Sequence, residues 1–386
     1  MVILDICLDN FYSFRNFHMN LTYPKKIVGS SVRDEHLSGR PNFRYKKVNI
    51  IMGSNASGKT TLGRVLMRIL NFMYRKNYER LTSTIGEPDR EASFRLDMAT
   101  PAKGSQETFF YRIACTIPPR REEGYGPEDI RLSVRREAIR PGDSYESCVR
   151  RIEGEAYVPE ESYLSELEKM GKLDWLFVYP EDSGRTLRFP NTDKEPRFQA
   201  ILENILKALD PSIERVERSQ DVDDAYVVRL RGRALILQNG EQFTTELLSS
   251  GTKAGVEVAR VLSALVHRRD TFYYCDEKFS YIHSDIERAV LALMIDAIPP
   301  DSQLFFTTHN TDILDMNLPK HAFTFLRKDM GEPDRPITCV EASSLLKRST
   351  DSLKNAVEND LFSAAPAVDL IYDIAERCGW GDGDGV

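Results

Sequence analysis

The order of apolar and polar residues predicts two α/β blocks, one at the start and one in the second half of the chain. Residues 1 to about 70 run as a strand, a polar loop, the apolar run KKVNIIM and the helical pattern TLGRVLMRILNFMYRK. From 225 onward, a helix from about 251 to 268 precedes the apolar run TFYYCDE, the helical SDIERAVLALMIDAI, and the runs SQLFFTTHN and HAFTFLRK. Continuous apolar strands between helices are typical of a sheet covered on both faces. The sequence therefore predicts an α/β fold.

Between these blocks the period of the pattern changes. Residues 91 to 158 contain short alternating segments such as SFRLDMAT and TFFYRIACTI, which predict an antiparallel sheet. Residues 159 to 209 are predicted to be helical, over EESYLSELEKMGKLDWLF and RFQAILENILKALD. The second helix has apolar residues spaced for one buried face: Phe198, Ile201, Leu202, Ile205, Leu206 and Leu209. The runs AYVVRLRG and RALILQNG predict a hairpin.

These patterns divide the chain into a head, residues 1–330, and a C-terminal helical extension, residues 331–386. Within the head we expect a first α/β part with an antiparallel β lobe at 1–158, a helical lobe at 159–224 and a second α/β part at 225–330. The extension is predicted to form helices around 342–347 and 350–377 and to end in a flexible tail, GWGDGDGV. Its apolar residues either pack on the core or form a docking helix. No heptad run is sustained over many turns, so no coiled-coil arm is predicted.

The sequence GSNASGKTT at residues 53–61 has the spacing of a P-loop, G-x-x-x-x-G-K-[ST], and lies between a predicted strand and a predicted helix. Glycines allow the backbone to approach phosphates closely, and the helix N-terminus adds a partial positive charge. The lysine is expected to reach the β- and γ-phosphates, and the first threonine to bind Mg²⁺. The alternative is a plain glycine turn. The predicted phosphate-binding residues are Gly53, Ser54, Asn55, Ala56, Ser57, Gly58, Lys59, Thr60 and Thr61.

Two acidic residues follow the apolar run of TFYYCDE. Asp276 stands where the strand emerges and is predicted to join Thr60 in the Mg²⁺ shell. Glu277, one residue later, points in another direction and is predicted to polarise an attacking water. The alternative is a strand that ends in two solvated acids, a common arrangement. The motifs around the pair favour the functional interpretation.

Two further sequence motifs add candidate residues to the predicted nucleotide site. In LSSGT, residues 248–252, Ser249 and Ser250 are predicted to cap a helix whose first turn contains Gly251, a second phosphate-binding geometry. Because the P-loop already serves the γ-phosphate, this second turn makes sense if it serves a nucleotide held by another copy. His309 ends the next apolar strand, where an imidazole could bond the γ-phosphate and the attacking water. The alternative is a satisfied core histidine.

Composition and charge argue against several classes of protein. The chain has 386 residues, 41% of them hydrophobic, and a net charge of −7, which argues against a uniformly nucleic-acid-binding surface. Segment 117–151 has eight arginines but also seven acidic residues, so it is interpreted as a mixed-charge surface. The six cysteines form no C-x-x-C pair, which indicates reduced thiols. No signal-peptide pattern or membrane-spanning run is present, so we expect a cytoplasmic protein without a membrane partner.

GSNASGKT, LSSGT, FYYCDE and FTTHN resemble the Walker A, signature, Walker B and switch-histidine motifs of ABC-type ATPases, over about 1–75 and 225–330. The opening LDNFYSFRNFHMNL resembles the RecF, SMC and OLD-like branch. This resemblance implies an ABC-type P-loop ATPase head with a mixed sheet flanked by helices, Mg²⁺-dependent ATP hydrolysis, and Lys59, Glu277 and His309 as catalytic residues. It also implies that Ser249 and Gly251 act across a homodimer or higher homo-oligomer with ATP at the interface.

The resemblance carries further implications and some departures. Ser280 to His283 would form the dimer-communicating loop, and Ser13 and Arg15 lie where the family often contacts the nucleotide. The signature reads LSSGT, not LSGGQ, which weakens a transporter interpretation. The glutamine loop is left open between Gln106 and Gln199.

Compact heads of this kind resemble ATPase subunits of bacterial anti-phage systems such as PARIS, Septu and retron modules. That resemblance implies a separately encoded effector, which could be a nuclease. The alternative is a RecF-like or SMC-like DNA-repair ATPase acting on DNA.

Overall fold

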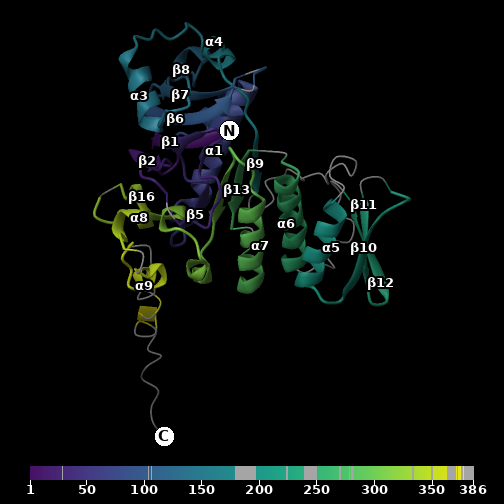
Figure 1. Cartoon of the computed structure of the whole chain (residues 1–386). Coiled ribbons are helices and arrows are strands. Elements are labelled where there is room, and N and C mark those ends of the chain that lie inside the picture. Colours follow the sequence, from purple (N-terminus) through teal and green to yellow (C-terminus); the bar gives the residue numbers. More distant parts are fainter. Residues whose placement is uncertain are drawn as a thin grey trace.

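The computed structural model describes residues 1–377 except 28, 103, 106, 179–196, 223–224, 239–249, 269–270, 278, 280–281, 333, 349–350, 363–370, 372 and 375–376. Its centre is a six-stranded sheet of order β16-β15-β5-β14-β13-β9 (Figure 1). The strands are β5 (Val48–Met52), β9 (Trp175–Val178), β13 (Phe272–Asp276), β14 (Gln303–Thr307), β15 (Phe323–Lys328) and β16 (Ile337–Glu341). Only the pairing of β16 with β15 is antiparallel.

Helices cover both faces of this sheet. Because successive strand residues point to opposite faces, Phe272 and Tyr274 of β13 pack in one cluster with α1 (Lys59–Arg75), whereas Tyr273 and Cys275 pack in another with α6 (Ser250–Val266) and α7 (Ser284–Ala297). Both faces of β13 are therefore apolar, which explains the continuous apolar run in its sequence. The helix α1 lies on one side of the sheet, and α6 and α7 lie side by side on the other (Figure 1).

An antiparallel lobe packs on the α1 side. Its sheet has the order β2-β1-β6-β7-β8, with β1 (Val2–Asp9), β2 (Phe17–Asn20), β6 (Ala92–Pro101), β7 (Thr108–Ile117) and β8 (Arg131–Ala138). Around it lie β3 (His36–Leu37), β4 (Arg40–Arg44), α2 (Glu79–Thr82), η1 (Pro127–Asp129), α3 (Tyr145–Gly154) and α4 (Tyr163–Glu168). The buried Gln303 amide joins lobe and sheet, because it bonds both backbone groups of Ile3 and the carbonyl of Lys46.

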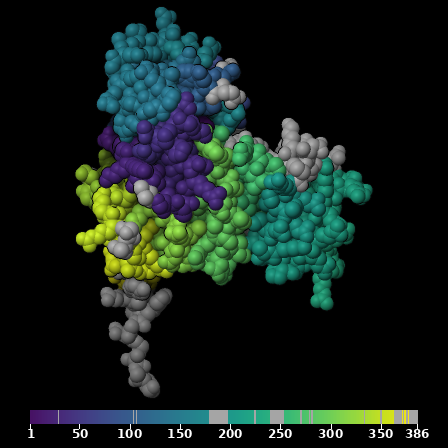
Figure 2. Space-filling model, viewed as in Figure 1, coloured from purple at the N-terminus to yellow at the C-terminus, as the bar shows by residue number. Residues whose placement is uncertain are grey.

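A third unit packs against α6. It consists of α5 (Phe198–Leu209) and a three-stranded antiparallel sheet of β10 (Ile213–Arg218), β11 (Ala225–Leu230) and β12 (Arg233–Gln238). Helices α5 and α6 approach closely at Gly255, where an added Cβ would lie 2.4 Å from Leu209 Cδ1. The space-filling view shows this unit protruding at one side, away from the antiparallel lobe (Figure 2).

The predicted α/β class is confirmed, and so are the predicted hairpin β11–β12 and the helices and strands from α6 to β15. The helical prediction for 160–177 is wrong in its second half, because β9 pairs in parallel with β13. The segment 159–224, predicted as a helical lobe, therefore contributes one strand to the central sheet and another, β10, to the third unit. Within the predicted antiparallel stretch 91–158, residues 145–154 are instead the helix α3.

The C-terminal prediction also needs correction. The predicted helical extension begins at 331, but β16 (Ile337–Glu341) forms the edge of the central sheet. Two short helices follow, α8 (Ala342–Leu345) and α9 (Leu353–Glu358), and turns at 359–362 interrupt the continuous helix predicted for 350–377. The predicted flexible tail, GWGDGDGV, lies outside the described residues. Within the described ranges, no helix has the length and apolar run needed for a membrane span.

Candidate nucleotide-binding site

The candidate site lies where three neighbouring parallel strands end. Thr307 of β14 pairs with Ile51 of β5 on one side and with Asp276 of β13 on the other. Because the carboxyl ends of parallel strands meet at one edge of a sheet, the segments after these strands lie together. They are the P-loop, Glu277 and the residues 308–310. Three motifs that together span residues 53 to 310 thus meet at one edge.

The P-loop backbone requires its glycines. A Cβ at Gly53 would lie 2.3 Å from the carbonyl oxygen of Leu326, and one at Gly58 would lie 2.6 Å from the side chain of Ile337. Gly58, which precedes α1, also has a φ of +102°, a left-handed conformation that favours glycine. Ala56 adopts a left-handed φ of +61° at the exposed tip of the loop. The loop is thus a tight turn that ends at a helix N-terminus, where backbone N–H groups have no intrahelical partner.

Lys59 connects the P-loop with the acidic edge. Its buried Nζ donates to the carbonyl oxygens of Gly53 and Ser54, at 2.8 and 3.1 Å, and lies 3.1 Å from Glu277 Oε1. The same carboxylate oxygen is 3.9 Å from Nδ1 of His309, whose side chain is 56% exposed. The structure therefore brings together the three residues predicted to be catalytic.

Glu277 takes up this position through an unusual backbone conformation. Its φ of +44° is left-handed, which costs roughly 1–2 kcal/mol for a residue with a Cβ. The turned backbone directs the Glu277 N–H to Thr307, with its hydroxyl oxygen at 2.9 Å and its carbonyl oxygen at 3.2 Å. Strained backbone of this kind tends to occur at functional sites.

Asp276 has the surroundings of a cation ligand. It is fully buried, and its Oδ2 has no hydrogen-bond partner among the described residues. Burial raises the pKa of Asp276, and the hydroxyls of Thr307 and Thr60 act in the opposite direction. A buried carboxylate oxygen beside a threonine hydroxyl offers the hard oxygen ligands that Mg²⁺ prefers. The residues predicted to bind the metal, Thr60 and Asp276, therefore fit it.

Tyr274 also contributes to the site, in a role that the sequence motifs do not indicate. Its hydroxyl donates to the carbonyl oxygen of Lys59 at 2.7 Å, and its ring lies against Gly63, where an added Cβ would be 2.5 Å from a ring carbon. Tyr274 therefore fixes the first turns of α1 to β13. An alternation argument could have found it, because Tyr274 stands two residues before Asp276 and on the same face of the strand.

The other predicted site residues are placed as follows. Ser54, Asn55, Ser57 and Thr61 lie in the P-loop or the first turn of α1, and Ser57 is buried. Ser250 and Gly251 open α6, which packs against α5 and α7 on the opposite face of the sheet from α1. Arg15 has other partners, since its guanidinium donates to Glu87 at 2.6 Å and to the carbonyl of Phe14 at 3.1 Å. Gln199 donates to the carbonyl of Val216. Ser249, Gln106, Ser280 and Tyr281 lie outside the described residues.

Two further polar groups lie in the antiparallel lobe. Asp5, Cys7 and His18 hold potential metal ligands within 4.8 Å of one another. The guanidinium of Arg95 already contacts this group, at 2.9 Å from Asp5 Oδ1 and 3.2 Å from Cys7 Sγ, and its positive charge disfavours a cation there.

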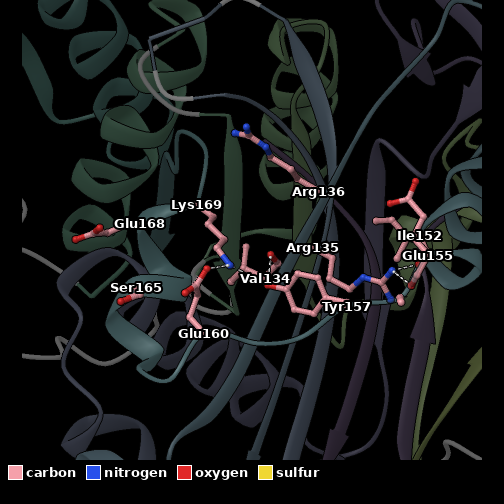
Figure 3. A pocket seen from close by; sticks show the side chains of 11 residues that line it. Val134, Arg135, Arg136, Ile152, Glu155, Tyr157, Glu160, Ser165, Glu168 and Lys169 are labelled. Atoms are coloured by element: carbon pink, nitrogen blue, oxygen red, sulfur yellow. Dashed lines mark hydrogen bonds and ion pairs between the residues drawn. The ribbon is translucent and has the colours of Figure 1, made fainter.

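The second group lines a surface cavity of about 650 Å³ beside β8 and α4 (Figure 3). Arg135 donates to the backbone of Ile152 and Glu155, and Lys169 pairs with Glu160 and Glu166. These two cations are thus engaged within the lobe itself.

A family model described as "AAA domain, putative AbiEii toxin, Type IV TA system" matches residues 48–315, the span that contains the P-loop, Asp276, Glu277 and His309. The chain belongs to this AAA-domain family. A comparison with curated protein sequences gives no match.

Among solved structures, an SMC head bound to the C-winged helix domain of ScpA is similar to this AAA-domain protein, with a TM-score of 0.51 and 15% identity over 92% of this chain and 100% of that chain. The SMC head domain from Thermotoga maritima has a TM-score of 0.44 and 14% identity, over 88% of this chain and 99% of that one. RecF-ATPrS of the RecFOR pathway has a TM-score of 0.40 and 10% identity, over 88% and 98%. The first match confirms the predicted fold class, because this chain shares the α/β fold of an SMC head.

Proposed function

We propose that this protein binds ATP with Mg²⁺ at the edge formed by β5, β14 and β13, and that it hydrolyses the terminal phosphoanhydride bond. The observation that carries the proposal is the position of the Glu277 carboxylate, 3.1 Å from the Lys59 ammonium and 3.9 Å from the His309 imidazole. A carboxylate beside the phosphate-binding lysine can accept the proton of a water that attacks the γ-phosphorus.

Each residue has a distinct part in this reaction. Lys59 binds the β- and γ-phosphate oxygens and stabilises their charge. Glu277 takes the proton of the attacking water, while the bond between the γ-phosphorus and the bridging oxygen breaks and ADP leaves. His309 donates a hydrogen bond to the γ-phosphate or to the water. Thr60 and Asp276 would hold Mg²⁺, which supplies charge neutralisation at the phosphates when bound.

Phosphate release and nucleotide binding, measured on the full chain, test this assignment. Glu277→Gln should bind ATP as the wild type does but lose about 10²- to 10⁴-fold in turnover, the range for a positioned general base. Lys59→Ala should lose nucleotide affinity as well. Wild-type turnover in Glu277→Gln would exclude Glu277 as the base.

We further propose that ATP closes two copies of the chain, with the LSSGT turn of one copy facing the P-loop of the other. The positions of α1 and α6 in different clusters on the two faces of the sheet support this arrangement, because the P-loop helix and the helix of the LSSGT turn are then separated within one chain. The mass of Glu277→Gln should double when ATP and Mg²⁺ are added, measured by sedimentation. A species that stays monomeric while ATP is bound would exclude the closed dimer.

The closed and open states are proposed to control a separately encoded effector in a bacterial anti-phage system. The family description, which includes a putative AbiEii toxin of a Type IV TA system, supports a search among the neighbouring genes. Purifying the protein with the products of those genes, with ATP and without it, tests the idea. Co-purification should differ between the two conditions.

The alternative, an ATPase that acts on DNA, predicts a different result. DNA should then stimulate ATP hydrolysis, and its binding should weaken steeply with salt. The ion pairs of Arg121 with Asp129 and of Arg151 with Asp143 occupy cations of the arginine-rich segment, which favours the mixed-charge interpretation.

A further inference from the structure

Glu287 is a buried carboxylate that contacts the two neighbours of His309. It lies in the first turn of α7 and is 5% exposed. Its Oε1 accepts a hydrogen bond from the hydroxyl of Thr308 at 2.9 Å, and its Oε2 accepts one from the side-chain amide of Asn310 at 2.7 Å. Both carboxylate oxygens are thus directed to the residues that flank His309.

The segment that carries His309 is closed by further hydrogen bonds. The hydroxyl of Thr308 accepts from the backbone N–H of Asn310 at 3.0 Å, and the amide oxygen of Asn310 accepts from the N–H of Asp312 at 2.9 Å. Asn310 therefore caps the short helix η3 (Thr311–Asp315) with its oxygen and binds Glu287 with its nitrogen. These contacts leave the backbone of His309 little freedom, although its side chain is exposed.

Glu287 also connects two segments that leave the catalytic edge. The chain that follows Glu277 enters α7 at Ser284, with His283 as the N-cap, and Glu287 lies three residues further in the same first turn. The chain that follows β14 contains His309. A single carboxylate therefore connects the start of α7 to the histidine segment.

We propose that Glu287 is a positioning residue for His309: it holds residues 308–310 so that the imidazole stays beside Glu277. The inference rests on the proposed ATP hydrolysis. The hydrogen-bond partners Thr308 and Asn310 belong to the histidine segment and not to the P-loop. Loss of Glu287 should therefore reduce turnover and leave nucleotide binding intact. A displacement of about 1 Å at a reacting group can cost about 10²-fold in rate.

The first test compares Glu287→Ala with Glu287→Gln in the full chain. Glu287→Ala leaves Thr308 and Asn310 without their acceptor and should lower kcat about 10- to 100-fold, with KM for ATP within about twofold of the wild type. Glu287→Gln should retain most of kcat, because its oxygen accepts from Asn310 and its nitrogen donates to the Thr308 hydroxyl. A low kcat in both variants, or a matching loss of ATP affinity, would overturn the proposal.

The second test exchanges the two partners. Asn310→Asp keeps an oxygen to cap η3 but places a second carboxylate against that of Glu287. It should therefore lower kcat as Glu287→Ala does. Adding Glu287→Gln to Asn310→Asp restores a donor facing an acceptor and should recover kcat at least severalfold. A double variant no better than Asn310→Asp alone would refute the direct contact as the cause.

A readout independent of hydrolysis separates this inference from the proposed function. Side-chain NMR signals of labelled histidines, with His309→Ala for assignment, should show the His309 signal shifted in Glu287→Ala and near its wild-type position in Glu287→Gln. If that pattern holds and the wild type releases no phosphate, the proposed function fails and the positioning contact stands. If the His309 signal is unchanged in Glu287→Ala, the positioning role fails even where ATP is hydrolysed.

Discussion

The hydroxyl of Thr307 donates a hydrogen bond to Oδ1 of Asp276 at 2.6 Å. The same hydroxyl accepts from the backbone N–H of Glu277 at 2.9 Å. One buried side chain therefore orients both the proposed metal ligand and the proposed base. Because Thr307 and Asp276 pair in register on neighbouring strands, their side chains lie on the same face of the sheet.

Removing this hydroxyl should weaken the site and the fold. Thr307→Val keeps the shape of the side chain but leaves a buried carboxylate oxygen without its donor, a loss of about 1–3 kcal/mol in the free energy of unfolding. Urea unfolding measures the loss, and Mg²⁺-dependent ATP binding should weaken in parallel. Thr307→Ser, which keeps the hydroxyl, is the matched control. Equal stability of the valine and serine variants would contradict the assigned role.

The raised pKa of Asp276 predicts that removing its charge increases the free energy of unfolding, by an amount that depends on pH. Burial, the main cause of the rise, disfavours the charged form in the folded protein. In the wild type this destabilisation is fully present above the folded pKa. It decreases as the pH falls through the folded pKa and disappears below the ordinary aspartate pKa, since the carboxyl is then protonated in both states.

Asp276→Asn should therefore raise the free energy of unfolding at neutral pH without Mg²⁺. The gain over the wild type should shrink as the pH is lowered through the folded pKa. With Mg²⁺ and ATP the order should reverse, because only the carboxylate binds the cation. Unfolding curves at several pH values measure both effects. A gain that is independent of pH would mean that the charge is not its cause.

The contact of Gly63 with Tyr274 predicts a steric effect on the P-loop helix. Gly63→Ala would place a Cβ 2.5 Å from the tyrosine ring and should cost about 1–3 kcal/mol in unfolding free energy. It should also reduce ATP affinity, because the Tyr274 hydroxyl holds the carbonyl of Lys59.

The matched control for this steric effect is Gly154→Ala. Gly154 ends α3, and an added Cβ there would meet nothing within 4 Å. Its substitution should leave stability unchanged or raise it by up to about 1 kcal/mol. Equal effects at both glycines would show that helix propensity, and not the tyrosine ring, sets the outcome.

Shared active sites predict that two inactive variants restore activity when mixed. Lys59→Ala inactivates the P-loop, and Ser249→Arg obstructs the proposed signature turn. In a mixed dimer one site carries both defects and the other carries neither. Equal mixing should therefore recover about a quarter of wild-type turnover, since about half of the dimers are mixed and each has one intact site. Turnover that stays at the level of the separate variants would contradict sites shared between copies.

The sequence by itself determined the elements whose signals are local. The P-loop was predicted because glycines, a lysine and threonines at fixed spacing specify one turn at one helix start, and the structure has that turn at 53–58. The strands β13 and β14 were predicted from their continuous apolar runs, and their polar ends identified Asp276, Glu277 and His309. The parallel arrangement that alternating strands and helices predict then places these ends at one edge.

Only the tertiary structure decided the contacts between distant segments. The strand β9 lies in a stretch of helical pattern, and its four residues become a strand because β13 offers a parallel partner. The sequence motifs assign no role to Tyr274, Thr307 or Glu287, and their partners Lys59, Asp276 and Asn310 are distant in the sequence. A hydrogen bond between such residues depends on strand register and helix placement, which result from packing of the whole chain and not from local propensity.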